Sequence, residues 1–86
     1  MRVVVLTNTR TDYARGVESF GTDFERRTGK ALEVIEAYSP EAEALARTYD
    51  IMQYPTILAL ADDGQVQNMW VGTNLPTISE VSYYVQ

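Results

Sequence analysis

The chain has 86 residues and a formal net charge of −5, from 7 basic and 12 acidic residues. It contains no cysteine and no histidine. This excludes disulfides, thiolate nucleophiles, thiolate zinc sites and iron–sulfur clusters, and removes the commonest general base. An acidic domain of this size is a poor partner for a phosphate backbone, so no nucleic acid is expected. Hydrophobic residues make up 45% and charged residues 22%, which predicts one globular domain over residues 1–86.

The apolar runs are short. Val3–Leu6 is too brief for a signal peptide, and no small-residue cleavage site follows it. Ile57–Ala61 is equally far from the length of a membrane span. The sequence therefore predicts a cytoplasmic protein with no membrane partner.

The N-terminal third predicts a strand and a helix. The β-branched run Val3–Leu6 is typical of a strand buried on both faces. After a polar loop, apolar residues recur at helical spacing; they are Tyr13, Val17, Phe20 and Phe24. Thr11 is expected to cap this helix, and Gly29 to end it in a left-handed conformation.

A second strand is expected over 32–38. Ser39 followed by Pro40 then predicts the start of a second helix, since a capping hydroxyl and a proline at the first position favour a helix start. Its apolar face contains Ala42, Leu45, Ala46 and Tyr49.

The C-terminal part predicts a hairpin and a closing helix. Strands over 55–60 and 65–71 flank Asp62–Gly64, where Asp-Gly is a strong hairpin signal. Strict alternation places Val66 and Trp70 on one face of the last strand and Met69 on the other. Residues 77–80 form a capping box for a short helix.

The resulting order is β-α-β-α-β-β-α. Two strands joined by a helix are expected to be parallel with a right-handed crossover, and the last two strands form a hairpin. The sequence thus predicts an α/β fold with a four-stranded mixed sheet flanked by three helices.

Two stretches resemble a known fold family. Residues 49–58 read Tyr-Asp-Ile-Met-Gln-Tyr-Pro-Thr-Ile-Leu and are followed by Asp63-Gly64 and Gly72. This pattern resembles the segment that leads thioredoxins into their cis-proline, next strand and final glycine. Residues 3–14 are similar to the glutaredoxin stretch from the first strand through Cys-Pro-Tyr-Cys, with Thr11 and Ala14 where the two cysteines would be. The resemblance implies a thioredoxin-like fold with a cis-proline before the third strand.

The chain departs from the family at the two positions that carry its redox cysteines. Redox members attack disulfides with a thiolate at a helix N-terminus and resolve the intermediate with a second thiol. Thr11 and Ala14 have no thiol. We therefore expect a redox-inactive domain with no catalytic residue, no cofactor and no metal.

The resemblance also implies a ligand groove between the start of the first helix and the cis-proline, where an extended peptide or glutathione pairs with the backbone. The expected groove residues are Thr9, Arg10, Thr11, Asp12, Tyr13, Ala14, Tyr54 and Pro55. Two questions stay open at this point. The loop before the first helix is either an anion pocket or ordinary turn and capping chemistry. The cis bond either presents a ligand or only shapes the fold.

Charged clusters elsewhere are interpreted as turn and helix-end residues rather than calcium or acid–base sites; they are Asp62, Asp63, Arg26, Arg27, Lys30, Glu41 and Glu43. Several aromatic residues either fill the core or form an interface; they are Tyr13, Tyr54, Trp70, Tyr83 and Tyr84.

Three functions follow from these patterns. The first is a module that binds a protein or peptide segment in the groove. The second is a structural, self-associating protein, such as a homodimer, with a vestigial groove. The third, an enzyme using Thr11 or Tyr13, is the weakest, because no nucleophile–base pair is visible.

Overall fold

A computed structural model describes residues 1–85 and contains the elements in the predicted order. The strands are β1 (Arg2–Thr7), β2 (Glu33–Glu36), β3 (Thr56–Leu60) and β4 (Val66–Val71). The helices are α1 (Ala14–Thr28), α2 (Pro40–Tyr49) and α3 (Ile78–Ser82). The predicted α/β fold with a four-stranded mixed sheet is confirmed. Within residues 1–85, no helix combines the length and the apolar character needed to cross a bilayer.

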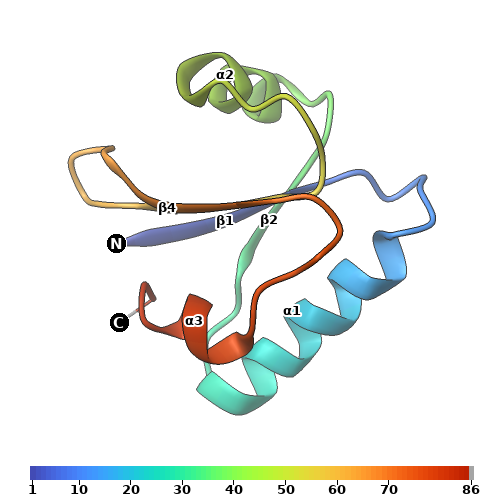
Figure 1. Cartoon of the computed structure of the whole chain (residues 1–86), viewed down its shortest axis with the longest axis vertical. Helices are drawn as coiled ribbons and strands as arrows, with labels where there is room; N and C mark the ends of the chain where they lie inside the picture. The colour runs from blue at the N-terminus through green and yellow to red at the C-terminus, as the bar shows by residue number, and fades with distance from the viewer. Residues whose placement is uncertain (86) are drawn as a thin grey trace.

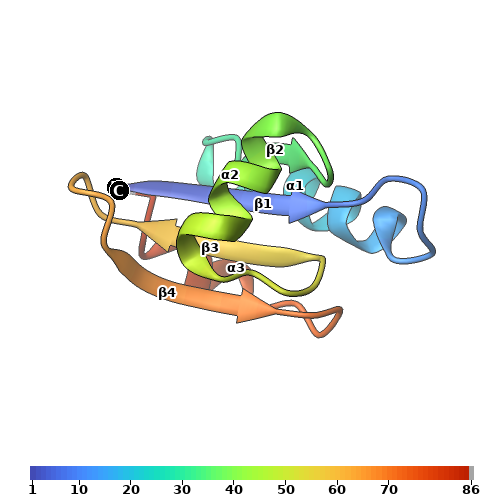
Figure 2. The same cartoon turned by 90° about the horizontal axis from the view of Figure 1, so that it is seen from above.

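The four strands lie in the order β2-β1-β3-β4, so that β2 and β4 are the edges of the sheet (Figure 2). β1 is parallel to β2 and antiparallel to β3, and β3 is antiparallel to β4. α2 covers one face of the sheet, and α1 and α3 cover the other (Figure 1). Because side chains alternate along a strand, β1 contributes Val3 and Val5 to the α1/α3 side and Val4 and Leu6 to the α2 side. Burial on both faces explains the continuous apolar run.

Local signals set the helix ends. Gly29 ends α1 with φ +75°, and its N–H donates to the Glu25 carbonyl at 2.8 Å, as the αL cap requires. The Ser39 hydroxyl accepts from the N–H of Ala42 at 3.1 Å at the start of α2. The predicted capping box of α3 is present as well. These expectations are confirmed.

The last strand departs from strict alternation. The pairing of β3 with β4 shifts by one residue between Ala59 and Leu60, which leaves Gln67 as an extra residue in a β-bulge. Val66 therefore lies with its partner Leu60 on the α2 side of the sheet. Trp70 packs against the α1/α3 cluster, so the prediction that it faces a helix is confirmed. The prediction that Val66 lies on the same face as Trp70 is wrong. The extra residue in the bulge moves the residues that precede the bulge to the opposite face of the sheet.

Candidate binding site

The loop between β1 and α1 is organised by Asn8. Its side-chain Oδ1 accepts from the N–H of Arg10 at 3.0 Å, and its carbonyl accepts from the N–H and the hydroxyl of Thr11 at 3.3 and 2.7 Å. α1 begins only at Ala14, and its N-cap, Tyr13, makes no side-chain cap hydrogen bond. The expected cap at Thr11 is wrong, because its hydroxyl donates back to Asn8 instead of accepting from the helix.

Thr9 joins the same loop to β2. Its N–H and its hydroxyl both donate to the Oε1 of Glu36, at 2.9 and 3.2 Å. The protein's own carboxylate therefore satisfies the donors that an anion would use. This contact favours turn chemistry over an anion pocket.

The Tyr54–Pro55 segment lies where β3 begins. Its peptide bond is cis, and Pro55 is buried. The Pro55 carbonyl accepts from the N–H of Gly72 at 2.8 Å, and the Thr56 hydroxyl donates to the Gln53 carbonyl at 2.7 Å. Within residues 1–85, no hydrogen bond involves the backbone N–H or C=O of Tyr54. The backbone of Tyr54 thus has no hydrogen-bond partner within the described residues.

Two side chains that the sequence analysis did not select extend this surface. Tyr38 follows β2 with φ +68°, an uncommon conformation for an aromatic residue, and 72% of it is exposed. Its ring meets that of Tyr54 edge-on, with centroids 5.9 Å apart. Met52, two residues before Tyr54 in the sequence, is 86% exposed. The available signal was the position of Tyr38 directly before Ser-Pro, where the chain turns from strand to helix.

The Tyr54 phenol has a raised pKa. Burial raises this pKa most, and the groups of Tyr38, Glu43 and Tyr13 raise it further. Tyr54 packs against the α2 cluster, whereas Tyr13 packs against the α1/α3 cluster on the other face of the sheet. The raised pKa keeps the Tyr54 hydroxyl protonated and able to donate a hydrogen bond.

The predicted groove residues do not line one cavity. Three of them line a groove on the side of α1 that faces β2; they are Thr9, Thr11 and Ala14. The others lie around the exposed loop and the start of β3; they are Arg10, Asp12, Tyr13, Tyr54 and Pro55. We call the exposed surface around Tyr38, Met52 and Tyr54 the Tyr54 surface.

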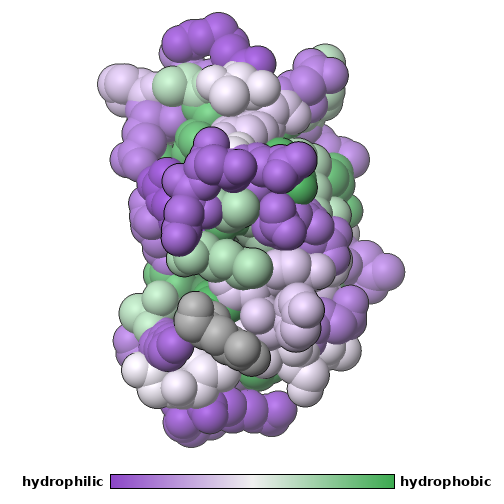
Figure 3. Space-filling view, turned by 90° about the vertical axis from the view of Figure 1, so that its left-hand side faces the viewer, coloured by the Kyte–Doolittle hydropathy of each residue, from purple (hydrophilic) through white to green (hydrophobic). Residues whose placement is uncertain are grey.

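The opposite end of the sheet carries the N-terminus and the β3–β4 turn, and hydrophilic residues predominate there (Figure 3). The N-terminal amine contacts the Asp62 carboxylate at 2.6 Å, and this hydrogen bond lowers the pKa of Asp62. Asp63 accepts from the N–H of Gln65 at 3.0 Å, as a hairpin turn predicts. Within residues 1–85, no group of three or more Asp or Glu side chains is arranged to hold a metal ion.

A second aromatic group lies over β4. The rings of Trp70 and Tyr84 meet edge-on at 5.6 Å, and those of Tyr83 and Tyr84 at 5.0 Å. Tyr84 also accepts a hydrogen bond from Asn68 at 3.2 Å. Tyr83 is 65% exposed, so this group combines packed rings with one outward tyrosine.

With this geometry, the chain has the thioredoxin fold. It is similar to thioredoxin 1 from the thermophilic eubacterium Thermosipho africanus TCF52B, with a TM-score of 0.66 and 15% identity over 99% of this chain and 90% of that chain. It is similar to a malarial protein, with a TM-score of 0.64 and 13% identity over 96% of this chain and 90% of that chain. A thioredoxin from Thermus thermophilus gives a TM-score of 0.60 and 18% identity over 94% of this chain and 67% of that chain.

No protein-family model matches the chain, and no curated protein matches its sequence. At these identities the solved structures establish the fold alone. The chain has no cysteine, so it lacks the thiols that thiol–disulfide exchange requires.

Proposed function

We propose that this chain is a non-catalytic binding module of thioredoxin fold that takes up an extended segment of another protein or a peptide at the Tyr54 surface. The observation that carries the proposal is the unpaired backbone of Tyr54 at the start of β3. An extended segment can donate to and accept from such a backbone, as a strand does in strand addition.

The side chains around Tyr54 support an interface. Tyr38 and Met52 are among the most exposed large apolar residues of the protein. Tyrosine and methionine are enriched in interface cores, and methionine adapts its shape to different partners. The protonated phenol of Tyr54, whose ring contacts that of Tyr38, adds a hydrogen-bond donor.

The charges near this surface have both signs. Arg10 and Asp12 are both exposed in the loop before α1, and Glu43 lies near Tyr54. The surplus of one negative charge gives only a slight preference for a basic segment. Affinity is therefore expected to come from backbone pairing and from packing against the aromatic rings.

The same geometry supports a non-catalytic role. The Thr11 hydroxyl donates to the Asn8 carbonyl, which is not a base that could activate it. Histidine and cysteine are absent from the sequence, so neither residue supplies a base or a nucleophile here.

A second candidate is self-association through the aromatic group over β4. The exposed ring of Tyr83, packed on Tyr84, is the observation that favours it. In this case the Tyr54 surface would be vestigial.

Chemical-shift mapping separates the two functions. The probes are reduced glutathione and extended heptapeptides selected from a random library on the immobilised protein. The binding module predicts amide shifts confined to residues 8–14, 38 and 52–55. Shifts at Trp70, Tyr83 and Tyr84 that grow with protein concentration, without any peptide, would establish self-association and contradict the module.

A further inference from the structure

A groove between α1 and the edge strand β2 has a volume of about 640 Å³. This is within the usual range of about 300–1,000 Å³ for binding pockets. Most of its lining side chains are small or apolar, and they include Ala14, Val17, Gly21, Ala31, Leu32 and Val34. We call it the α1–β2 groove; it is distinct from the Tyr54 surface.

One polar atom in the lining has no partner. Thr7 lines the α1–β2 groove and is only 3% exposed, yet its hydroxyl makes no hydrogen bond within residues 1–85. Buried hydroxyl groups are normally paired, and a valine would fill the same space without an unpaired group. This oxygen has less than 1 Å² of accessible surface, so it lies beneath the wall of the groove, and the groove itself presents mainly small and apolar side chains to an occupant.

The edge strand beside the groove is open. β2 pairs with β1 and with no other strand of the described chain. The Ala37 N–H donates to the Thr7 carbonyl at 2.6 Å, and alternate residues of a parallel strand point toward the same partner. The backbone of Val34 therefore points away from β1, toward the open edge, and its side chain is 55% exposed. An open edge with an apolar residue is a template for another strand.

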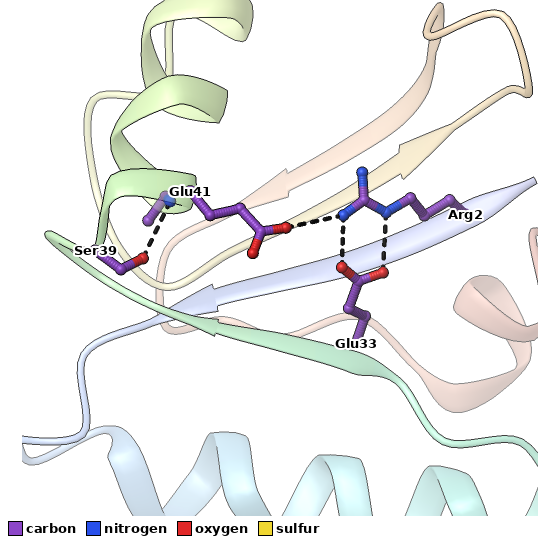
Figure 4. Close-up of polar contacts among 5 residues, drawn as sticks. Arg2, Glu33, Ser39 and Glu41 are labelled. Carbon is purple, nitrogen blue, oxygen red and sulfur yellow. Dashed lines mark hydrogen bonds and ion pairs between the residues drawn. The ribbon is translucent and has the colours of Figure 1, made fainter.

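The charges on both sides of this edge are predominantly negative. On the α2 side, Glu33 and Glu41 share the single guanidinium of Arg2 (Figure 4). In the α1–β2 groove, Glu18 and Glu25 accompany the single guanidinium of Arg15. Both surroundings therefore favour a partner that carries positive charge.

We propose that β2 receives an extended strand of a partner protein, with apolar side chains in the α1–β2 groove and lysine or arginine side chains on the α2 side. This alternation follows from the period of two along a strand. A second copy of the chain fits less well, because β2 itself begins and ends with glutamate and would bring like charges together. The proposal concerns a surface other than the Tyr54 surface, so either can fail alone.

The probe that tests this proposal is the peptide acetyl-Val-Lys-Val-Lys-Val-amide. Its pattern reads the same in both directions, so it can pair parallel or antiparallel to β2. The control, acetyl-Val-Glu-Val-Glu-Val-amide, keeps the strand pattern and reverses the charge. The lysine peptide is expected to shift the amides of residues 7, 14–21 and 31–36, and to bind about tenfold more tightly than the glutamate peptide.

Three variants localise the contact. Val34→Lys places a positive charge on the β2 edge and is expected to weaken binding of the lysine peptide about tenfold. Val66→Lys, at an exposed valine on the other edge strand, is the matched control and should leave binding unchanged. Thr7→Val keeps the shape of the buried side chain and removes a hydroxyl that the groove does not expose, so it is a second control and should leave binding unchanged.

Each contrary result overturns the proposal. No binding of the lysine peptide, equal binding of both peptides, or unchanged binding to Val34→Lys would reject the strand site. Shifts confined to residues 38 and 52–54 would assign the peptide to the Tyr54 surface. Shifts of β2 with protein concentration alone would make a second copy the occupant. If the two peptides bind with equal affinity and the dye 8-anilinonaphthalene-1-sulfonate displaces both, the groove binds small apolar molecules and not a strand.

Discussion

The sheet interior and the Tyr54 surface follow different rules. In the interior, Phe24 and Leu58 have no exposed area and pack on opposite faces of the sheet. At the Tyr54 surface, Tyr38 and Met52 are largely exposed, and Tyr38 takes a left-handed backbone conformation that costs free energy. The comparison shows that the packed layers provide most of the stability. The Tyr54 surface instead combines exposed apolar side chains with an unfavourable backbone conformation at Tyr38. Such departures are expected where a protein binds.

The helix starts repeat this contrast. α2 and α3 begin with side-chain caps at Ser39 and Thr77. α1, which begins beside the Tyr54 surface, has no side-chain cap at Tyr13. The first N–H groups of α1 are thus not satisfied by a cap, in contrast with those of the other two helices.

The largest expected change is covalent and tests the geometry of the loop. The Ala14 N–H donates to the Thr11 carbonyl at 3.2 Å, which closes a turn between the two residues. A turn holds the Cα atoms of its ends within about 7 Å, close to the range that a disulfide spans. The variant Thr11→Cys/Ala14→Cys is therefore expected to form an intramolecular disulfide under mild oxidation, measured by thiol titration. Free thiols or disulfide-linked dimers in a folded sample would contradict the turn.

In the interior, Phe24→Ala is expected to lower the free energy of unfolding by about 3 to 5 kcal/mol. The side chain is fully buried in the α1/α3 cluster, and alanine leaves a cavity. Phe20→Ala, one turn away and only partly buried, is the control and should cost less. Urea unfolding measures both, and equal losses would show that the two rings are buried alike.

At the helix starts, Ser39→Ala is expected to cost about 1 kcal/mol, because it removes the cap of α2. Thr11→Ala should cost less, because the Thr11 hydroxyl bonds to Asn8 and not to the helix. Urea unfolding again provides the comparison. A larger loss for Thr11→Ala would mean that Thr11 caps α1 after all.

The smallest expected effect concerns the ion pair of Arg2 with Glu33. Hydrogen bonds from Arg2 lower the pKa of Glu33, although burial opposes this shift. A lowered pKa in the folded state stabilises the protein above the ordinary pKa of glutamate, and this contribution is lost as the pH falls through the folded-state value. Both side chains are 44% exposed, so Glu33→Gln should cost at most about 1 kcal/mol near neutral pH.

The control for this pair is the same substitution in acid. At a pH well below the lowered pKa of Glu33 the wild-type carboxyl is protonated, so Glu33→Gln should be close to neutral there. Urea unfolding at both pH values measures the difference. A loss that is equal at both would show that the glutamine acts through packing and not through charge.

Local signals explain how much of the fold could be predicted from the sequence. Ser39-Pro40, the capping box at Thr77 and the glycine at position 29 each depend on neighbours within one turn of chain, and each was predicted correctly. The bulge at Gln67 was not predicted, because it depends on the register between two strands. Because the prediction lacked this bulge, it placed Val66 on the wrong face of the sheet.

The candidate site shows the same limit of local reasoning. The resemblance to glutaredoxins selected the loop and the resemblance to thioredoxins selected Tyr54, whereas the capping preference of threonine predicted that Thr11 starts the helix. The competing acceptor, the carbonyl of Asn8, becomes apparent only in the folded turn. Met52 was missed because nothing in its immediate sequence distinguishes an exposed methionine from a buried one. Tyr38 was missed although its position directly before Ser-Pro marks the turn from strand to helix.

The most direct test of the account compares two exposed tyrosines. Tyr38 lies on the Tyr54 surface and Tyr83 lies on the aromatic group over β4, with 72% and 65% of each exposed. Calorimetric affinities of the selected heptapeptides are measured for the wild type, Tyr38→Ala and Tyr83→Ala, after unfolding curves show that both variants are folded. The account predicts that Tyr38→Ala weakens binding about tenfold or more, as loss of a central interface tyrosine does, and that Tyr83→Ala leaves it unchanged. Unchanged binding by Tyr38→Ala together with a loss in Tyr83→Ala would contradict the central claim.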